Sequence, residues 1–162
     1  MSPPPSQSIT VGCIHTERDK NLIEGLIVSQ SVYQFDHEWK LERERLSSLE
    51  RVLDPATIQT LQEIRFSPKW RCLEAGAGGG SIAEWLCQAV GRSGYVVATD
   101  VDLKFLKALV YPNLEVLKHD LIVDELPQGE FDLVHERSVL AHLPQREDIL
   151  KKLANAVKPG GW

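Results

Sequence analysis

The sequence has few cysteines and no long apolar run, and each absence excludes a class of protein. Cys13, Cys72 and Cys87 are the only cysteines among its 162 residues. Their number is odd and no CxxC pair occurs, so we expect neither a disulfide framework nor a zinc site, and no metal site is predicted. Cys72 lies in a strand-like run, where a buried small hydrophobe is expected. No apolar run approaches the roughly 20 residues that span a bilayer.

Positive charge is not in excess either. The formal net charge is −5, with acidic and basic residues interspersed, and such a field attracts neither nucleic acid nor an anionic membrane. The N-terminal residues Met1–Ser8 lack a basic region followed by an apolar one, so they do not predict a secretory signal. A reducing, cytoplasmic setting is therefore expected.

The N-terminal part of the chain is predicted to contain helices but no sheet. Residues 1–30 begin with a Pro/Ser-rich stretch and are predicted to be partly disordered. Residues 31–66 form a predicted helical region in which one helix covers Asp36–Leu53 and a second begins at Asp54–Pro55, because Asp before Pro is typical of a helix start. One face of the first helix is apolar and the other charged; the apolar residues are Trp39, Leu46, Leu49 and Leu53.

From residue 67 to 162 the pattern alternates between strands and helices. Strands are predicted at 70–74, 95–99, 113–117 and 131–135. Helices are predicted at 81–90, from Asp102 to Leu109, and around 149–157. Such alternation predicts an α/β fold with a parallel sheet and helices on both faces, in three Rossmann-like layers.

The glycine-rich turn after the first strand is the strongest candidate for a ligand site. It reads Glu74-Ala75-Gly76-Ala77-Gly78-Gly79-Gly80, between a strand and a helix. A turn without side chains lets a ligand lie against bare main chain at a helix N-terminus. A dinucleotide-binding turn would place glycine or alanine at position 81, which is serine here. This difference alone favours another nucleotide ligand only modestly.

Two aspartates follow the next strands. Asp100 ends the second strand, where a carboxylate can accept both hydroxyls of a ribose; a helix cap is the structural alternative. Asp120 follows the third strand and could accept from an exocyclic amine, although a loop aspartate often only forms a turn. Ribose binding is common to dinucleotide and S-adenosylmethionine (SAM) sites, so Asp100 does not discriminate between them.

With the rest of the chain from about Trp70 onward, these positions resemble the class I SAM-dependent methyltransferases. The resemblance rests on the order and spacing of five segments: 74–80, 97–100, 119–121, 131–143 and 157–161. It implies SAM as cofactor, a methyl acceptor that is a small molecule, and a sheet in which the order runs 3-2-1-4-5-7-6. A weaker resemblance of residues 33–46 to a subgroup of small-molecule methyltransferases agrees with that acceptor.

The resemblance also implies roles for individual residues. Glu74 and the main chain of the glycine turn would hold the methionine moiety, Asp100 the ribose, and Asp120 with its neighbours the adenine. Main-chain carbonyls after the fourth strand would contact the amino group. The candidate cofactor-binding residues are Glu74, Gly76, Ala77, Gly78, Gly80, Asp100, Val101, Asp120, Leu121 and Glu136. His135 and His142 are the nearest candidates for a base, but no catalytic residue is assigned.

A complete domain of this family has seven strands, whereas about four are predicted here. We therefore expect a truncated domain, an exposed edge on the fourth strand, and self-association through that edge. Two other functions stay open: a non-catalytic SAM-binding module that needs a partner chain, and an NAD-dependent oxidoreductase.

Overall fold

A computed structural model describes residues 17–64 and 66–162, with side chains from residue 40 onward. The chain divides into two units, Met1–Leu41 and Glu42–Trp162. The described part of the first unit is helical and belongs to α1 (Glu17–Glu63), which continues into the second unit. Residues 17–30 are thus helical, whereas the prediction of disorder for residues 1–16 lies outside the described residues. The domain boundaries expected from the sequence, at 1–30, 31–66 and 67–162, stay predictions.

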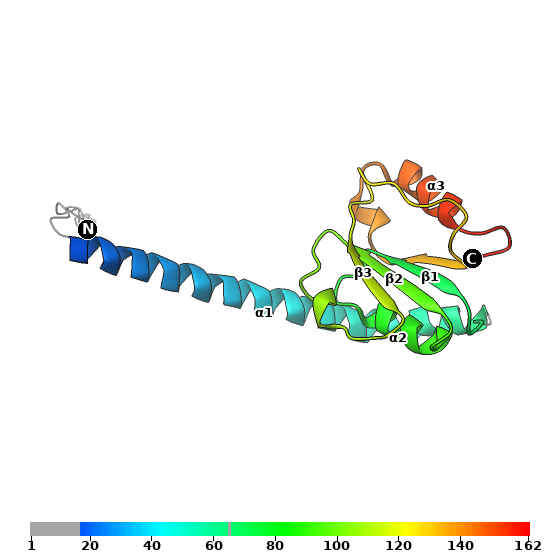
Figure 1. Ribbon diagram of the computed structural model, residues 1–162, viewed down its shortest axis with the longest axis horizontal. Coiled ribbons are helices and arrows are strands. Elements are labelled where there is room, and N and C mark those ends of the chain that lie inside the picture. Colours follow the sequence, from blue (N-terminus) through cyan, green and yellow to red (C-terminus); the bar gives the residue numbers. More distant parts are fainter. Residues whose placement is uncertain (1–16, 65) are drawn as a thin grey trace, which may run out of the picture. The chain divides into compact units, whose positions relative to one another are not determined.

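A four-stranded parallel sheet forms the centre of the second unit (Figure 1). Its strands are β1 (Arg71–Ala75), β2 (Tyr95–Asp100), β3 (Leu114–Lys118) and β4 (Leu133–Glu136). Their order is β3-β2-β1-β4, which confirms the first four positions of the expected order. The direction of the crossovers reverses between β1 and β4, so the carboxyl ends of these two strands border a crevice in which open parallel sheets bind ligands.

Helices cover both faces of this sheet, which confirms the three layers. On one face, α2 (Ser81–Val90) and the end of α1 pack against the strands, and on the other lies α3 (Arg146–Ala156) (Figure 1). The first core contains Leu61, Cys72, Ile82, Leu86 and Val96. The second contains Leu73, Val97, Phe131, Ile149 and Leu153. Cys72 is fully buried, as expected.

One helix occupies the region where two were predicted. The helix α1 runs through Asp54 and contains Pro55 in its interior, so the predicted helix start is wrong. Proline removes one helical hydrogen bond, but Leu61 and the neighbouring Ile58 and Ile64 bury their side chains against the sheet. This packing holds the part of the helix that follows the proline. Of the predicted apolar face, the side chain of Trp39 lies outside the described residues.

The short helix predicted from Asp102 to Leu109 is also wrong. The segment contains only a single 3₁₀ turn, η1 (Leu106–Ala108). Asp102 accepts a hydrogen bond from the Lys104 N–H at 3.0 Å and so forms a local turn. Leu106 is the only buried residue of η1, and Leu103 and Leu109 pack partly buried against the same core cluster.

The outer edge of β4 is partly covered by the chain itself. The Trp162 N–H donates to Asp132 O, and the Val134 N–H donates to Trp162 O, both at 2.9 Å. Phe131 and Val157 form an isolated parallel bridge beside the same strand. The edge of β4 is therefore paired up to Val134, so the expectation of an unpaired edge is wrong for this part of the strand. Self-association through the edge stays a prediction.

Candidate functional site

The glycine turn joins β1 to α2, and its backbone is held by the neighbouring strand. The N–H groups of Gly76 and Ala77 both donate to Thr99 O, at 2.8 and 2.9 Å. Gly76 has φ +71°, and a Cβ placed on it would lie 2.2 Å from Val139 Cγ2. Gly80 ends the turn as the N-cap of α2 with φ 91°. The turn thus requires glycine for its backbone conformation and for the close approach of Val139.

Asp100 lies at the end of β2 and is oriented by this turn. Its Oδ2 accepts from the Gly78 N–H at 2.8 Å, and its Oδ1 accepts from the Asp102 N–H at 3.1 Å. A carboxylate has about four lone-pair positions, so both oxygens can accept further hydrogen bonds. The side chain lines a cavity of about 280 Å³, which we call the Asp100 cavity.

The Asp100 cavity brings together most residues of the predicted adenosine site. Val101, Asp120 and Leu121 line it along with His119 and His142. Asp120 Oδ1 accepts from the Ile122 N–H at 2.9 Å, so this residue forms a turn as well. Leu121 is buried and Val101 is 58% exposed, which leaves the valine free to pack on a planar ligand.

A second, smaller cavity of about 80 Å³ lies over the glycine turn; we call it the loop cavity. Glu74, Ala77 and Gly78 line it from the sheet side. Leu46, Leu49, Glu50 and Leu53 of α1 line it from the other side. Gly76 and Ser138 line both cavities, so the two adjoin and together offer room for an elongated ligand.

Glu74 is 3% exposed and lies in register with His135 on the neighbouring strand. The Nδ1 of His135 is 2.6 Å from Glu74 Oε2. Burial raises the pKa of Glu74 above its ordinary value, against the opposing effect of His135. Burial alone would lower the pKa of His135, but its hydrogen bond with Glu74 and the charge of that carboxylate outweigh burial and raise it. The pair therefore retains a shared proton.

The loop after β4 connects the site to α1. Arg137 Nη2 lies 2.8 Å from Asp54 Oδ1, and Arg137 Nη1 donates to Thr57 Oγ1 at 3.1 Å. Ser138 follows with φ 66°, a conformation that non-glycine residues seldom adopt and that occurs often at ligand sites. These contacts place Ser138 at the junction of the two cavities.

Glu136, a predicted cofactor-binding residue, lines neither cavity. Its Oε2 accepts from the N–H groups of Val139 and Leu140 at 3.1 and 3.3 Å. The side chain thereby caps the 3₁₀ turn η2 (Leu140–His142). The side chain thus shapes the loop that carries Ser138, and contact of Glu136 with a cofactor stays a prediction.

Sequence reasoning missed the contribution of α1. Leu46, Leu49 and Leu53 were expected on one helix face. The spacing of apolar residues cannot show that this face lies over the glycine turn. Arg43 is exposed on the charged side of this helix, and its Nη1 also donates to Gly79 O at 3.3 Å. Long-range contacts of this kind leave no local signal in the sequence.

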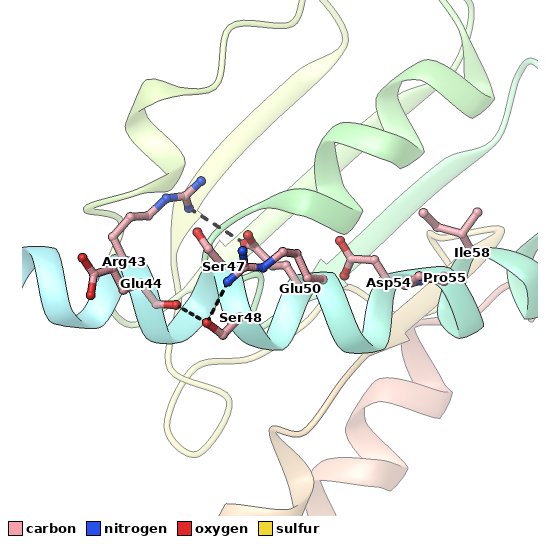
Figure 2. A pocket seen from close by; sticks show the side chains of 9 residues that line it. Arg43, Glu44, Ser47, Ser48, Glu50, Asp54, Pro55 and Ile58 are labelled. Atoms are coloured by element: carbon pink, nitrogen blue, oxygen red, sulfur yellow. Dashed lines mark hydrogen bonds and ion pairs between the residues drawn. The ribbon is translucent and has the colours of Figure 1, made fainter.

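A hollow larger than these two cavities lies elsewhere on α1 (Figure 2). It measures about 790 Å³ and extends from Arg43 to Ile58. All of its lining residues come from one helix, so it is an open surface with no opposing wall. Glu50 is shared with the loop cavity.

Two further findings concern the described residues, 17–64 and 66–162. None of their helices combines the length and the apolar character needed to cross a membrane. Within the same ranges, no group of three or more His, Cys, Asp or Glu side chains could hold a metal ion.

Known proteins resemble the chain in sequence and in fold. A family model described as a methyltransferase domain matches residues 73–162. Methyltransferase str3 of Strobilurus tenacellus is 31% identical over 78% of this chain and 44% of its own length. The ubiquinone biosynthesis O-methyltransferase of Bordetella avium (strain 197N) is 31% identical over 68% of this chain and 48% of its own. The chain thus spans about half the length of these curated relatives.

A solved structure agrees with the fold. A SAM-dependent methyltransferase from Aquifex aeolicus is 25% identical, with a TM-score of 0.57 over 70% of this chain and 67% of its own. The family match covers the glycine turn, Asp100, Asp120 and the loop after β4, which form the two cavities together with residues of α1. The chain therefore belongs to the family of SAM-dependent methyltransferases.

Proposed function

We propose that the second unit binds SAM across the two cavities and transfers its methyl group to a small-molecule acceptor. The ribose would lie on Asp100, the adenine between Val101 and Asp120, and the methionine over the glycine turn. The main support is that Gly78 aims the Asp100 carboxylate into a cavity that adjoins the loop cavity.

The residues of the site fit this cofactor. Asp100 keeps acceptor capacity on both carboxylate oxygens, as a ribose diol requires. The glycine turn has an open main chain at the N-terminus of α2, where the helix dipole favours the methionine carboxylate. Asp120 retains an oxygen for which no partner is recorded among the described residues, and it can accept from the adenine amine.

When bound, SAM would supply a methyl group on a sulfonium, which leaves as a neutral thioether. The protein then needs mainly to align the acceptor and exclude water. Leu46, Leu49 and Leu53 provide an apolar wall for this purpose. We assign no general base: His135 is engaged by Glu74, and His142 is exposed at the rim of the Asp100 cavity.

Calorimetric titration of the chain with SAM, S-adenosylhomocysteine and NAD tests the cofactor. We expect SAM and S-adenosylhomocysteine to bind and NAD not to bind; binding of NAD alone would overturn the proposal. Transfer of labelled methyl groups is then measured to small catechols, thiols and amines, with bulk protein and RNA as comparison acceptors. Cofactor binding without transfer to any small acceptor would instead favour a binding module that needs a partner chain.

A further inference from the structure

Glu50 is the one acidic residue of α1 that lines the loop cavity. Its carboxylate packs against the glycine turn so closely that a Cβ on Gly79 would lie 2.0 Å from Oε1. The side chain is 16% exposed. A helix residue therefore carries a negative charge onto the main chain of the candidate cofactor site.

One oxygen of this carboxylate lacks a hydrogen bond among the described residues. Glu50 Oε1 is buried, and no donor among the described residues forms a hydrogen bond with it. The nearest cation, Arg43 Nη1, is 3.8 Å away and donates to Gly79 O. Burying a charged oxygen without a donor is costly, and such a group at a ligand site indicates a donor supplied by the ligand.

The surroundings favour a cationic donor. Glu74 contributes a second acidic side chain to the same cavity, and three leucines exclude water from the opposite wall. The one cation that lines this cavity, Arg137, is paired with Asp54. Low polarity strengthens an interaction between a carboxylate and an ammonium group.

We propose that Glu50 accepts a hydrogen bond from the α-ammonium group of the cofactor's methionine moiety. This inference rests on the proposed function and adds a cofactor-binding residue outside the family-matched segment, which begins at residue 73. The Glu50 carboxylate would compensate the ammonium charge, while the glycine turn holds the rest of the amino acid.

Two ligands separate this contact from a structural role. S-adenosylhomocysteine carries the amino acid, whereas 5′-methylthioadenosine lacks it and keeps the adenosine. We expect Glu50→Gln to raise the calorimetric Kd of S-adenosylhomocysteine by about tenfold or more, because a charged hydrogen bond is lost. The Kd of 5′-methylthioadenosine should stay the same, which also shows that the variant is folded.

Glu44→Gln is the matched control, because Glu44 lies on the same helix, is exposed and does not line the loop cavity. An unchanged affinity of Glu50→Gln for S-adenosylhomocysteine would overturn the inference. An equal loss of affinity for both ligands would also overturn the inference, since Glu50 would then only support the fold. If the unaltered chain binds neither SAM nor S-adenosylhomocysteine, the proposed function itself fails.

Discussion

His135 and Glu74 share a 2.6 Å hydrogen bond between Nδ1 and Oε2, although they lie 61 residues apart. They occupy matching positions on β4 and β1, so the parallel register brings the two titratable groups together. The pKa of each group is raised, first by burial in the case of Glu74 and by its partner in the case of His135. The pair therefore couples the stability of the sheet to pH.

We predict that stability falls as the pH rises above the ordinary histidine value of 6.5. A raised pKa in the folded state stabilises the fold below the unfolded value and loses that contribution as the pH passes through the folded value. The raised pKa of Glu74 acts with the same sign from 4.5 upward. The free energy of unfolding in urea, measured from about pH 6 to 9, should decline as the pair loses its proton.

The double variant Glu74→Gln, His135→Asn should lose most of this decline, because both titrating groups are removed; His135→Asn alone would leave the buried Glu74 without the partner that lowers its pKa. His142→Asn is the control, because His142 is exposed. The same pH slope in both variants and in the unaltered chain would contradict the assignment.

The hydrogen bonds of Asp100 give a prediction about the adenosine half of the cofactor. Asp100→Asn should weaken the binding of S-adenosylhomocysteine and of 5′-methylthioadenosine alike, because both ligands contain the ribose. A hydrogen bond to a charged group contributes about 1.5–3 kcal/mol, so the Kd should rise roughly 10- to 100-fold.

Calorimetric titration measures this change, and Asp102→Asn is the matched control. Asp102 is exposed, and its carboxylate accepts a local hydrogen bond from the Lys104 N–H. Unchanged affinity of Asp100→Asn for both ligands would remove the proposed ribose contact.

The parts of the fold that could be predicted are those encoded locally. The bounds of α2, Ser81–Val90, follow from a glycine turn before an apolar helical face and a glycine after it. The strands were predicted within two residues because buried parallel strands are continuous apolar runs. Asp100 and Asp120 were likewise expected to lie near each other, since the carboxyl ends of adjacent strands meet at one edge of the sheet, and both line the Asp100 cavity. Ser138, Val139 and Leu143, from the loop after β4, were not expected in it.

What could not be predicted depends on contacts between distant segments. The helix start at Asp54–Pro55 was wrong because Asp54 pairs with Arg137 and does not cap a helix. The charge of Glu50 near Gly79 is invisible in the sequence, as is the bond between Glu74 and His135. In each case the local pattern is compatible with several partners, and the tertiary packing selects one.

Gly76 gives a prediction in which backbone strain and steric clash can be separated. Gly76→Ala should destabilise the fold by about 2–4 kcal/mol, since positive φ costs alanine about 1–2 kcal/mol and overpacking adds to it. The added methyl would lie 2.2 Å from Val139 Cγ2. Unfolding in urea measures the loss.

Gly129→Ala is the matched control, because Gly129 also has positive φ, +59°, but nothing within 4 Å of its Cβ position. It should show the backbone cost alone. Val139→Ala added to Gly76→Ala should relieve the clash and recover part of the stability. Equal losses at Gly76 and Gly129 would show that Val139 does not constrain the turn.

The ion pair between Arg137 and Asp54 gives a prediction about how α1 is held on the site. Both side chains are about one-fifth exposed, at 22% and 20%, so the pair is partly shielded from water. A double-mutant cycle of Arg137→Met and Asp54→Asn, measured by urea unfolding, should give a coupling energy of roughly 0.5–3 kcal/mol. Arg137→Met should also speed hydrogen exchange in α1 from residue 42 to 63, because the loop after β4 no longer anchors the helix. Arg51→Met, which removes an exposed guanidinium whose recorded bond is to Ser48 on the same helix, should change neither quantity. A coupling energy near zero, with exchange in α1 unaltered, would mean that the apolar contacts of Ile58, Leu61 and Ile64 hold this helix without the ion pair.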